Sequence, residues 1–469
     1  MKKILSSGMM LVLAMSVMTG CKAASDSPGR TETKGEENVY QIHTGMVEAV
    51  YPEMASYPNE EEYTDKKTGE FDSEGFSKVF DVWWEQKRSR WDLPEGFVQE
   101  LEPFFASSIR QFLTEEIPGE EEGNRIYSPV NVYMALSMLA ETTDGDSRQQ
   151  VLELLGVDSL ESLRTQAGTL WRSNYSQDGA VTSLLANSLW LDQDIEFKKE
   201  TLNSLAENYY ASTYWGQMGS KELDERLQSW LNEQTGGLLK EQASGIHMTD
   251  ETLMALASTT YFRAKWTEEF SKSNTKEGIF HGPQGDNTCD FMHQSGTNAY
   301  YWGAKFGAVQ KSLQESGGMW LILPDEGVTP KELLLEDEVM ELFLSEEEWI
   351  DRKYLTVNLA MPKFDVVSNI SLKQGLEKLG VSDVFDSSKS DFTPLVEGID
   401  GIFVSQASHA ARVAVDEEGC VATAYTVMSA AGAAMPPDET MDFVLDRPFM
   451  FVITSDSGFP LFAGIVNQP

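Results

Sequence analysis

Cysteine and positive charge are both scarce in this chain of 469 residues. Cys21, Cys289 and Cys420 are its three cysteines, too few for a disulfide framework or a cysteine-based zinc site. Lysine and arginine number 36 against 75 aspartates and glutamates, which gives a formal net charge of −39. Such a surface repels phosphate backbones and anionic lipids, so we expect no nucleic-acid partner and no basic membrane-binding patch.

Motifs that build catalytic or cofactor sites are also missing. The five histidines do not pair at metal-ligand spacing, and there is no His-Glu-x-x-His, no G-x-S-x-G, no G-x-G-x-x-G and no phosphate-binding loop. Acidic runs such as Glu120–Glu122 lack neighbours that would make one carboxyl an acid and another a base, so we interpret them as solvated faces. We therefore expect no enzyme, no metal site and no cofactor.

The composition that remains is globular. Apolar residues make up 41% and charged residues 24%, enough to bury a large core. Apolar residues recur at helical spacing in 97–113, and 130–139 and 147–155 predict further helices. Strands are predicted in the second half, at Gly318–Leu323, Tyr354–Ala360, Arg412–Val415, Met441–Leu445 and Phe449–Ile453. This is an α+β arrangement built on a large sheet.

The N-terminus has the pattern of an export signal. Lys2 and Lys3 precede an apolar run in 9–18 that is too short to span a bilayer, which predicts a signal peptide over residues 1–20. Met18-Thr19-Gly20-Cys21 resembles the lipobox of bacterial lipoproteins, in which the cysteine is acylated after cleavage. We expect an exported chain whose contact with a membrane is a lipid on Cys21. The alternative is an ordinary secreted, extracellular protein.

Three further segments follow the signal. Residues 21–45 are polar and predict a flexible tether. Residues 46–95 form an acidic, aromatic extension, and 96–469 form the body of the protein. Trp83 and Trp84 in the extension could form a carbohydrate or partner platform, but we expect such residues to pack the extension onto the body.

One long run carries no charge. From Cys420 to Pro437 the sequence reads CVATAYTVMSAAGAAMPP, directly after the acidic Asp416-Glu417-Glu418-Gly419. Written as a strand, one face holds Cys420, Ala422 and Ala424, and neither face has a charge that would forbid burial inside a sheet. A mobile surface linker is the alternative that composition leaves open.

Several motifs between about Glu100 and Pro469 resemble those of the serpins, the serine protease inhibitors. They are Tyr127-Ser128-Pro129-Val130-Asn131, Leu185–Trp190, Tyr261–Trp266, Leu323–Gly327, Met361-Pro362-Lys363-Phe364, Ser405–His409 and Phe443–Phe451. The resemblance implies the serpin fold, with helices packed on three β-sheets and an exposed reactive-centre loop at about 417–440 that inserts into the large sheet.

The resemblance also implies roles for particular residues. The hinge of the loop would be Glu417, Glu418, Gly419, Cys420, Val421, Ala422, Thr423 and Ala424. The reactive bond would be Ala433–Ala434, and the shutter beneath the large sheet would comprise Ser128, Pro129, Asn131 and His409. Val328 stands where some members carry a lysine partner for the hinge glutamate.

The function implied is inhibition of serine proteases by suicide-substrate loop insertion. Because Ala433 is small, we expect elastase-like or subtilisin-like targets, with papain-like cysteine proteases as further candidates and trypsin-like enzymes ignored. We expect a monomer. Two alternatives remain: a serpin without inhibitory activity, acting as a carrier or chaperone, and a surface-binding lipoprotein that uses Trp83 and Trp84.

Overall fold

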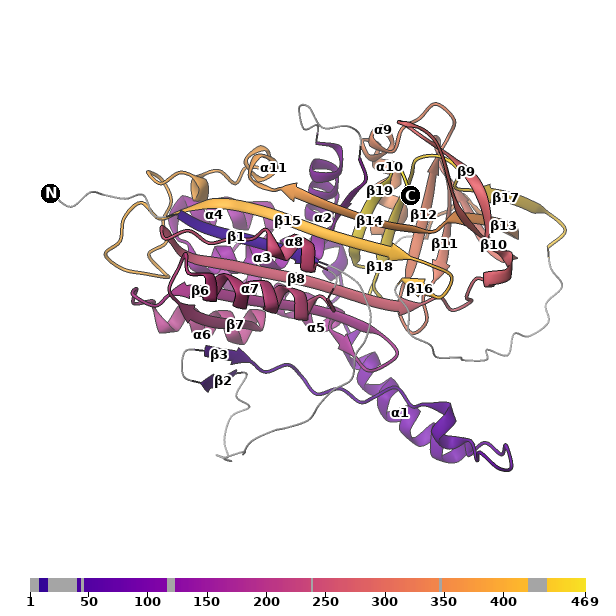
Figure 1. Ribbon diagram of the computed structural model, residues 1–469, viewed down its shortest axis with the longest axis horizontal. Helices are drawn as coiled ribbons and strands as arrows, with labels where there is room; N and C mark the ends of the chain where they lie inside the picture. The colour runs from indigo at the N-terminus through magenta and orange to yellow at the C-terminus, as the bar shows by residue number, and fades with distance from the viewer. Residues whose placement is uncertain are drawn as a thin grey trace.

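The strands form two hydrogen-bonded sheets, around which the helices are arranged (Figure 1). The computed structural model describes residues 8–15, 40–43, 46–115, 123–237, 239–345, 348–420 and 437–469. The ten strands of the larger sheet are β1 (Gly8–Met15), β2 (Tyr40–His43), β3 (Met46–Ala49), β5 (Ser176–Gln177), β6 (Thr182–Asp192), β7 (Ala211–Gly216), β8 (Thr252–Lys265), β14 (Phe364–Ser371), β15 (Phe403–Val415) and β16 (Gly419–Cys420).

The second sheet has nine strands. They are β4 (Arg125–Tyr127), β9 (Lys276–Gly282), β10 (Gly285–Trp302), β11 (Phe306–Ser312), β12 (Gly318–Pro324), β13 (Arg352–Pro362), β17 (Thr440–Val444), β18 (Phe449–Thr454) and β19 (Pro460–Val466). The long β10 pairs with β9 and β13 and, at its end, with β11. Because β10 pairs with all three, two of the three sheets expected from the sequence are joined into one network.

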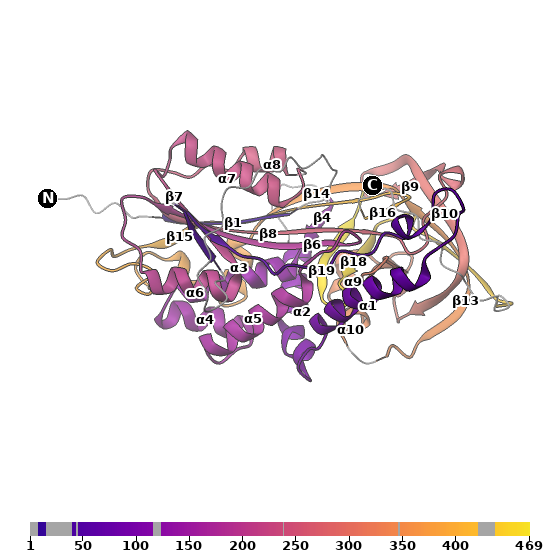
Figure 2. The same ribbon diagram turned by 90° about the horizontal axis from the view of Figure 1, so that it is seen from below.

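The helices lie on both faces of the larger sheet (Figure 2). They are α1 (Ser73–Arg90), α2 (Phe97–Thr114), α3 (Pro129–Thr142), α4 (Gly145–Leu155), α5 (Leu160–Asn174), α6 (Lys199–Tyr209), α7 (Lys221–Gln234), α8 (Lys240–Ser244), α9 (Pro330–Leu334), α10 (Asp337–Leu344) and α11 (Lys373–Lys378). α3 to α6 lie on one face, and α7 and α8 on the opposite face (Figure 2). The three helices and the strand regions predicted from the sequence are confirmed, with ends that differ by a few residues, except that the strand predicted at Arg412–Val415 begins nine residues earlier, at Phe403.

Helix α3 is buried over its whole length beneath the larger sheet. Its start is fixed by Ser128, whose side chain accepts a hydrogen bond from the backbone N–H of Asn131, and by Pro129 at the first helical position. A helix that is apolar all round must be covered on every side. This places the first turn of α3 directly below the strands of the larger sheet.

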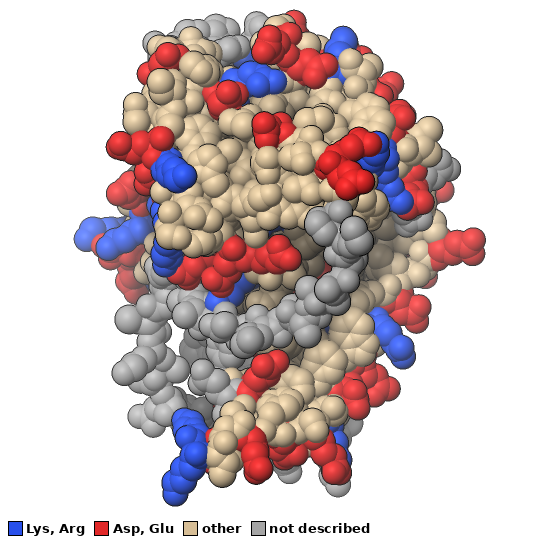
Figure 3. Space-filling view, turned by 90° about the vertical axis from the view of Figure 1, so that its right-hand side faces the viewer, with Lys and Arg blue, Asp and Glu red and all other residues tan. Residues whose placement is uncertain are grey.

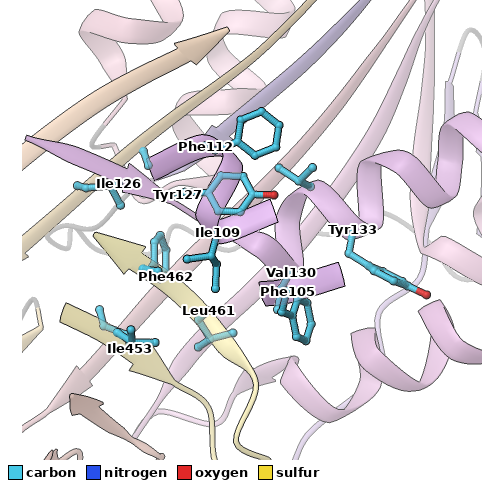
Figure 4. Packing of buried hydrophobic residues seen from close by; sticks show 14 of the residues in the cluster. Phe105, Ile109, Phe112, Ile126, Tyr127, Val130, Tyr133, Ile453, Leu461 and Phe462 are labelled. Atoms are coloured by element: carbon cyan, nitrogen blue, oxygen red, sulfur yellow. The ribbon is translucent and has the colours of Figure 1, made fainter. Parts of the chain in front are cut away.

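A single hydrophobic cluster holds α3 in this position (Figure 4). It joins α2, α3 and β4 to β18 and β19, and among its members are Phe105, Ile109, Phe112, Ile126, Tyr127, Val130, Tyr133, Ile453, Leu461 and Phe462. Each large apolar side chain buried in this way contributes about 1.5–3 kcal/mol. The floor of the larger sheet is therefore a rigid, densely packed body.

The N-terminal extension packs against one end of the larger sheet. Trp83 in α1 is 1% exposed, and its Nε1 donates to Asp178 Oδ2 at 2.9 Å. Lys87, one turn later, lies 3.1 Å from Glu315 Oε2 and 3.5 Å from Asp456 Oδ2. The prediction that the tryptophans pack the extension onto the body is confirmed for Trp83, whereas Trp84 is 38% exposed.

Two segments near the N-terminus pair in the larger sheet of the full-length chain. β1, which lies within the predicted signal peptide, runs parallel to β8 and β15 and between them. β2, which lies within the predicted tether, pairs with β3, and β3 pairs with β7. Cleavage before Cys21 would remove β1 and retain β2. Cys21 itself lies outside the described residues.

Candidate functional site

The site begins with the space between strands β8 and β15 in the larger sheet, which we call the lane. At one end of the lane, β16 pairs antiparallel with both walls: Cys420 lies opposite Val415 of β15 and opposite Ala264 of β8. At the other end, β1 pairs with β8 up to Thr260. Among the described residues, no strand occupies the lane beside Tyr261–Arg263. The two walls are thus separated along their length and accept a strand between them.

A tight turn leads from β15 into β16. Asp416 Oδ1 accepts hydrogen bonds from the backbone N–H groups of Glu418 and Gly419, at 2.9 and 3.2 Å. A Cβ atom at Gly419 would lie 2.4 Å from the carbonyl oxygen of Ala264, so only glycine allows this close approach to β8. The turn therefore reverses the chain directly into the lane.

Glu417 anchors this turn from inside the protein. It is 6% exposed, and its carboxylate lies 3.0 Å from Lys363 Nζ and accepts a hydrogen bond from Thr275 Oγ1 at 2.8 Å. Burial alone would raise the pKa of Glu417, but the hydrogen bonds from Lys363 and Thr275 hold this pKa below the ordinary 4.5. The buried carboxylate is therefore ionised and paired at neutral pH.

The second hinge glutamate lies on the surface. Glu418 Oε1 accepts a hydrogen bond from Lys272 Nζ at 2.7 Å, and the Lys272 side chain is 70% exposed. The backbone carbonyl of Glu418 accepts from the N–H of Trp266, directly after β8. Both glutamates of the predicted hinge thus hold the turn, one inside the protein and one outside.

Cys420 marks the face of the loop that points into the core. Its side chain is 1% exposed within the main hydrophobic cluster, and burial raises the pKa of its thiol. A neutral, small side chain is therefore accommodated at the first position of the lane. Successive residues of a strand alternate between faces, so Ala422 and Ala424 would share the inward face of Cys420 if the strand continued.

The four predicted shutter residues are brought together beneath the lane. His409 on β15 accepts a hydrogen bond at Nε2 from the backbone N–H of Ser128 at 3.1 Å, and Pro129 follows as the first residue of α3. Asn131 donates from Nδ2 to Ser258 Oγ on β8 at 3.0 Å. The first turn of α3 thereby links the two walls of the lane.

His409 is held neutral in this position. It is fully buried, and burial lowers its pKa to about 3. Neutral Nε2 can accept the hydrogen bond from Ser128, which a protonated imidazole could not. A positive charge below the lane is thus excluded at physiological pH.

The far end of the loop is fixed by β17. This strand pairs parallel with β13, and Glu439 just before it lies 2.6 Å from Lys353 Nζ. Val421, Ala422, Thr423, Ala424, Ala433 and Ala434 lie outside the described residues. The structure therefore places the two anchors of the predicted loop and leaves the reactive bond a prediction.

The hinge glutamate has a lysine partner from another part of the chain. Glu417 pairs with Lys363, which lies between β13 and β14, and Val328 has no part in this contact. In the sequence, Met361-Pro362-Lys363-Phe364 resembles a family motif, but nothing there indicates a role for Lys363. A pair separated by this much chain has no local spacing signal, so only the fold brings it together.

Among the described residues, no cluster of three or more His, Cys, Asp or Glu side chains could hold a metal ion. No helix within the described ranges is long and apolar enough to cross a membrane. What the site offers is a gap for a strand, two anchored ends of a loop, and a rigid floor.

Comparison with known proteins identifies relatives of this arrangement. The family model described as "Serpin (serine protease inhibitor)" matches residues 104–469. Serpin-Z1C of Triticum aestivum is 28% identical over 370 residues, which cover 75% of this chain and 92% of the relative. The leukocyte elastase inhibitor of Sus scrofa is 30% identical over 385 residues, 78% of this chain and 97% of the inhibitor.

Solved structures agree on the fold. The thermophilic serpin tengpin in its native state has a TM-score of 0.69 and 24% identity, over 81% of this chain and 95% of tengpin. Arabidopsis AtSerpin1 in its native stressed conformation has the same TM-score and identity, over 80% of this chain and 100% of its own. Thyroxine-binding globulin in complex with thyroxine has a TM-score of 0.67 and 21% identity, over 79% of this chain and 99% of the globulin.

Proposed function

The chain belongs to the serpin family, and on this premise we propose that it traps serine proteases as acyl-enzymes by inserting its cleaved loop into the larger sheet. The observation that carries the proposal is the pairing of β16 with both β8 and β15. The loop has already entered the lane by its first two residues. Serpins are inhibitors and not catalysts, in keeping with the expectation of no enzyme.

The covalent step is supplied by the protease. Its serine Oγ attacks the carbonyl carbon of Ala433, the bond to the nitrogen of Ala434 breaks, and the amine of Ala434 leaves with a proton. The result is an ester between the protease and Ala433. This cut frees Gly419–Ala433, fifteen residues, from their distal anchor at β17.

Insertion of the freed segment matches the lane in length. β8 has 14 residues, and at about 3.3 Å per residue it spans roughly 46 Å. Fifteen inserted residues would therefore fill the lane along β8. In the full-length chain β1 occupies part of it, and cleavage before Cys21 would clear that part.

The driving force for insertion would come from the backbone groups of β8 and β15 that removal of β1 leaves unpaired. A strand in the lane would satisfy backbone groups on both β8 and β15 and bury the small side chains that follow Cys420. The protease, tethered to Ala433, would be carried to the opposite end of the sheet and distorted before water could hydrolyse the ester. The native form must then be metastable and held by a kinetic barrier.

The proposed targets are elastase-like or subtilisin-like serine proteases. Ala433 would fill a small specificity pocket, whereas a trypsin-like pocket would keep its buried carboxylate unpaired. One relative is a leukocyte elastase inhibitor by name. Papain-like cysteine proteases, which also form acyl intermediates, are further candidates.

The proposed location is outside the cytoplasm, with Cys21 lipidated at the cell surface of a bacterium or the chain secreted. A predominantly negative, monomeric protein would remain soluble there and attract cationic proteases. A surface-binding role through Trp83 and Trp84 loses support because Trp83 is buried against Asp178. Thyroxine-binding globulin, whose fold is similar, was solved in complex with thyroxine, which would suit a carrier. The uncharged run after Cys420 favours loop insertion over a carrier role for this chain.

The test is a gel experiment with the mature chain, residues 21–469. Incubation with an elastase-like enzyme, a subtilisin-like enzyme and trypsin should give a band that survives boiling in detergent for the first two only. Cleavage of the loop without such a band, for every protease tried, would contradict trapping and support a carrier.

A further inference from the structure

A groove lies between β9 and β17, beside the distal anchor of the loop. We propose that this groove is a second docking surface for the target protease and takes a surface loop of that enzyme in which an apolar side chain lies next to a basic one. The proposal rests on the proposed function, because the partner that it assigns to the groove is the protease that the reactive loop would bind.

The groove lies between the strands β9 and β17, which are joined at one end by a hydrogen bond. The backbone N–H of His281, in β9, donates to the carbonyl oxygen of Asp446 at 2.7 Å and closes one end. Between β9 and β17, the strands β10 and β13 form the floor through Phe291, Leu359 and Ala360. The volume of this open groove is about 690 Å³. This is enough for several side chains of a partner.

Its walls carry large apolar side chains that the fold leaves uncovered. Ile279 on β9 is 54% exposed and Val444 on β17 is 39% exposed, although both lie over a buried floor. Exposed apolar surface gathered in one hollow, rather than scattered singly, is typical of an interaction site. The groove thus offers a site for an apolar side chain.

Acidic side chains surround this apolar surface. Glu277, Asp442 and Asp446 line the groove, against one lysine, Lys276. Asp442 accepts a hydrogen bond from Asn358 Nδ2 at 2.7 Å, which positions its carboxylate at the rim. Figure 3 looks onto the end of the molecule where β9, β13 and β17 lie, and the charged side chains on this face are mostly acidic. A lysine or arginine of a partner would be attracted to this rim.

The distance to the reactive bond selects the protease as the occupant. β17 begins at Thr440, six residues after Ala434, and six residues span at most about 20 Å. An enzyme held at Ala433–Ala434 is therefore within reach of the groove. A second copy of this chain is a poor occupant, because two surfaces of net charge −39 repel each other.

The first experiment compares rates of trapping. Ile279→Ser removes the apolar wall and Glu277→Lys reverses one rim charge. Both should slow association with the trapped elastase-like enzyme roughly three- to tenfold and leave the stoichiometry of trapping unchanged. The controls are Val82→Ser on α1, 55% exposed, and Glu207→Lys on α6, and both should associate at the rate of the unsubstituted protein. A rate unchanged in Ile279→Ser and Glu277→Lys would overturn the proposal.

A second experiment separates this proposal from the proposed function. A protease whose catalytic serine is replaced by alanine can dock on the loop but cannot be acylated. Its dissociation constant should rise by the same factor for Ile279→Ser and Glu277→Lys. If the unsubstituted chain traps no protease, the proposed function fails, and this binding measurement still decides the docking surface: equal constants, or no binding, would overturn it.

Discussion

The carboxylate of Glu417 lies 3.0 Å from the ammonium nitrogen of Lys363, below the turn that leads the loop into the larger sheet. Glu417 is buried, and Lys363 stands between β13 and β14. The pair joins the start of the loop to the short segment between β13 and β14. The pair therefore holds the point where insertion must begin, and we call the contact between Glu417 and Lys363 the latch.

Lys363→Met should weaken this latch. It leaves the Glu417 carboxylate buried with Thr275 as its remaining partner, so the free energy of the first unfolding transition in urea should fall. Removing one partner of a fully buried pair costs about 3–5 kcal/mol, but Lys363 is 37% exposed, so we expect about 1–2 kcal/mol. Lys221→Met, in an exposed pair with Glu225, is the control. Equal losses in the two variants would contradict the latch.

The contribution of the latch should also depend on pH. The pKa of Glu417 is lowered in the folded protein, so its stabilisation is fully present above the ordinary value of 4.5 and is lost as the pH falls through the folded value. The difference in unfolding free energy between the unsubstituted protein and Lys363→Met should therefore be constant above pH 5 and shrink below pH 4. A difference that grows on acidification would be the wrong sign.

The shutter histidine gives a second pH dependence, at higher pH. Burial lowers the pKa of His409 from 6.5 to about 3, so between these values the unfolded chain binds a proton that the native chain does not. Stability is full above about pH 6.5 and falls toward pH 3, by up to about 1.4 kcal/mol per pH unit. His409→Gln keeps an acceptor for Ser128 and removes the titration. Its stability should fall less steeply between pH 6.5 and 4, and parallel curves would refute this role of His409.

The inward face of the loop should reject charge. Cys420 lies opposite Ala264 and points into the core, so continued pairing would place Ala424 beside Thr260, which is also buried. Ala424→Glu would bury an unpaired carboxylate and cost several kcal/mol on insertion. The variant should be cleaved as a substrate, with many chains consumed per protease trapped. Thr423→Glu, on the opposite face, should trap protease more efficiently than Ala424→Glu. If Ala424→Glu traps protease at a stoichiometry near one, the register or the mechanism is wrong.

The position of the reactive bond should decide the choice of target. Mass spectrometry of the released C-terminal peptide should find Ala434 at its start. Ala433→Arg should lose trapping of elastase-like enzymes and gain trapping of trypsin, because arginine pairs with the carboxylate of the trypsin pocket. A peptide that starts at Gly432 or Met435 would shift the register, and one that starts outside Cys420–Pro437 would refute the assignment of the loop.

Local features of the fold could be predicted from the sequence. Ser128 and Pro129 indicate the start of a helix, and the apolar spacing after Phe97 indicates the buried face of another. Both features depend on residues within one or two turns. These predictions succeed because hydrogen bonding and steric fit act over a few residues.

Contacts between distant segments could not be predicted in the same way. The pair of Glu417 and Lys363, and the link from Asn131 to Ser258, arise only when β8, β15 and α3 are packed together. The groove between β9 and β17 likewise has no sequence signal, since Ile279 and Val444 look like ordinary strand residues in the sequence. Charge and periodicity describe single elements, whereas these sites belong to the packing.

The most direct measurement of the central claim is the melting temperature of residues 21–469 before and after a single cut in the loop. The account holds that the native form is kept from its more stable, strand-inserted form by a barrier, which the cut removes. The midpoint should then rise by at least about 10 °C, which in a domain of this size corresponds to a gain of about 10 kcal/mol. A confirmed single cut between Cys420 and Pro437 that leaves the midpoint unchanged or lowers it would contradict insertion.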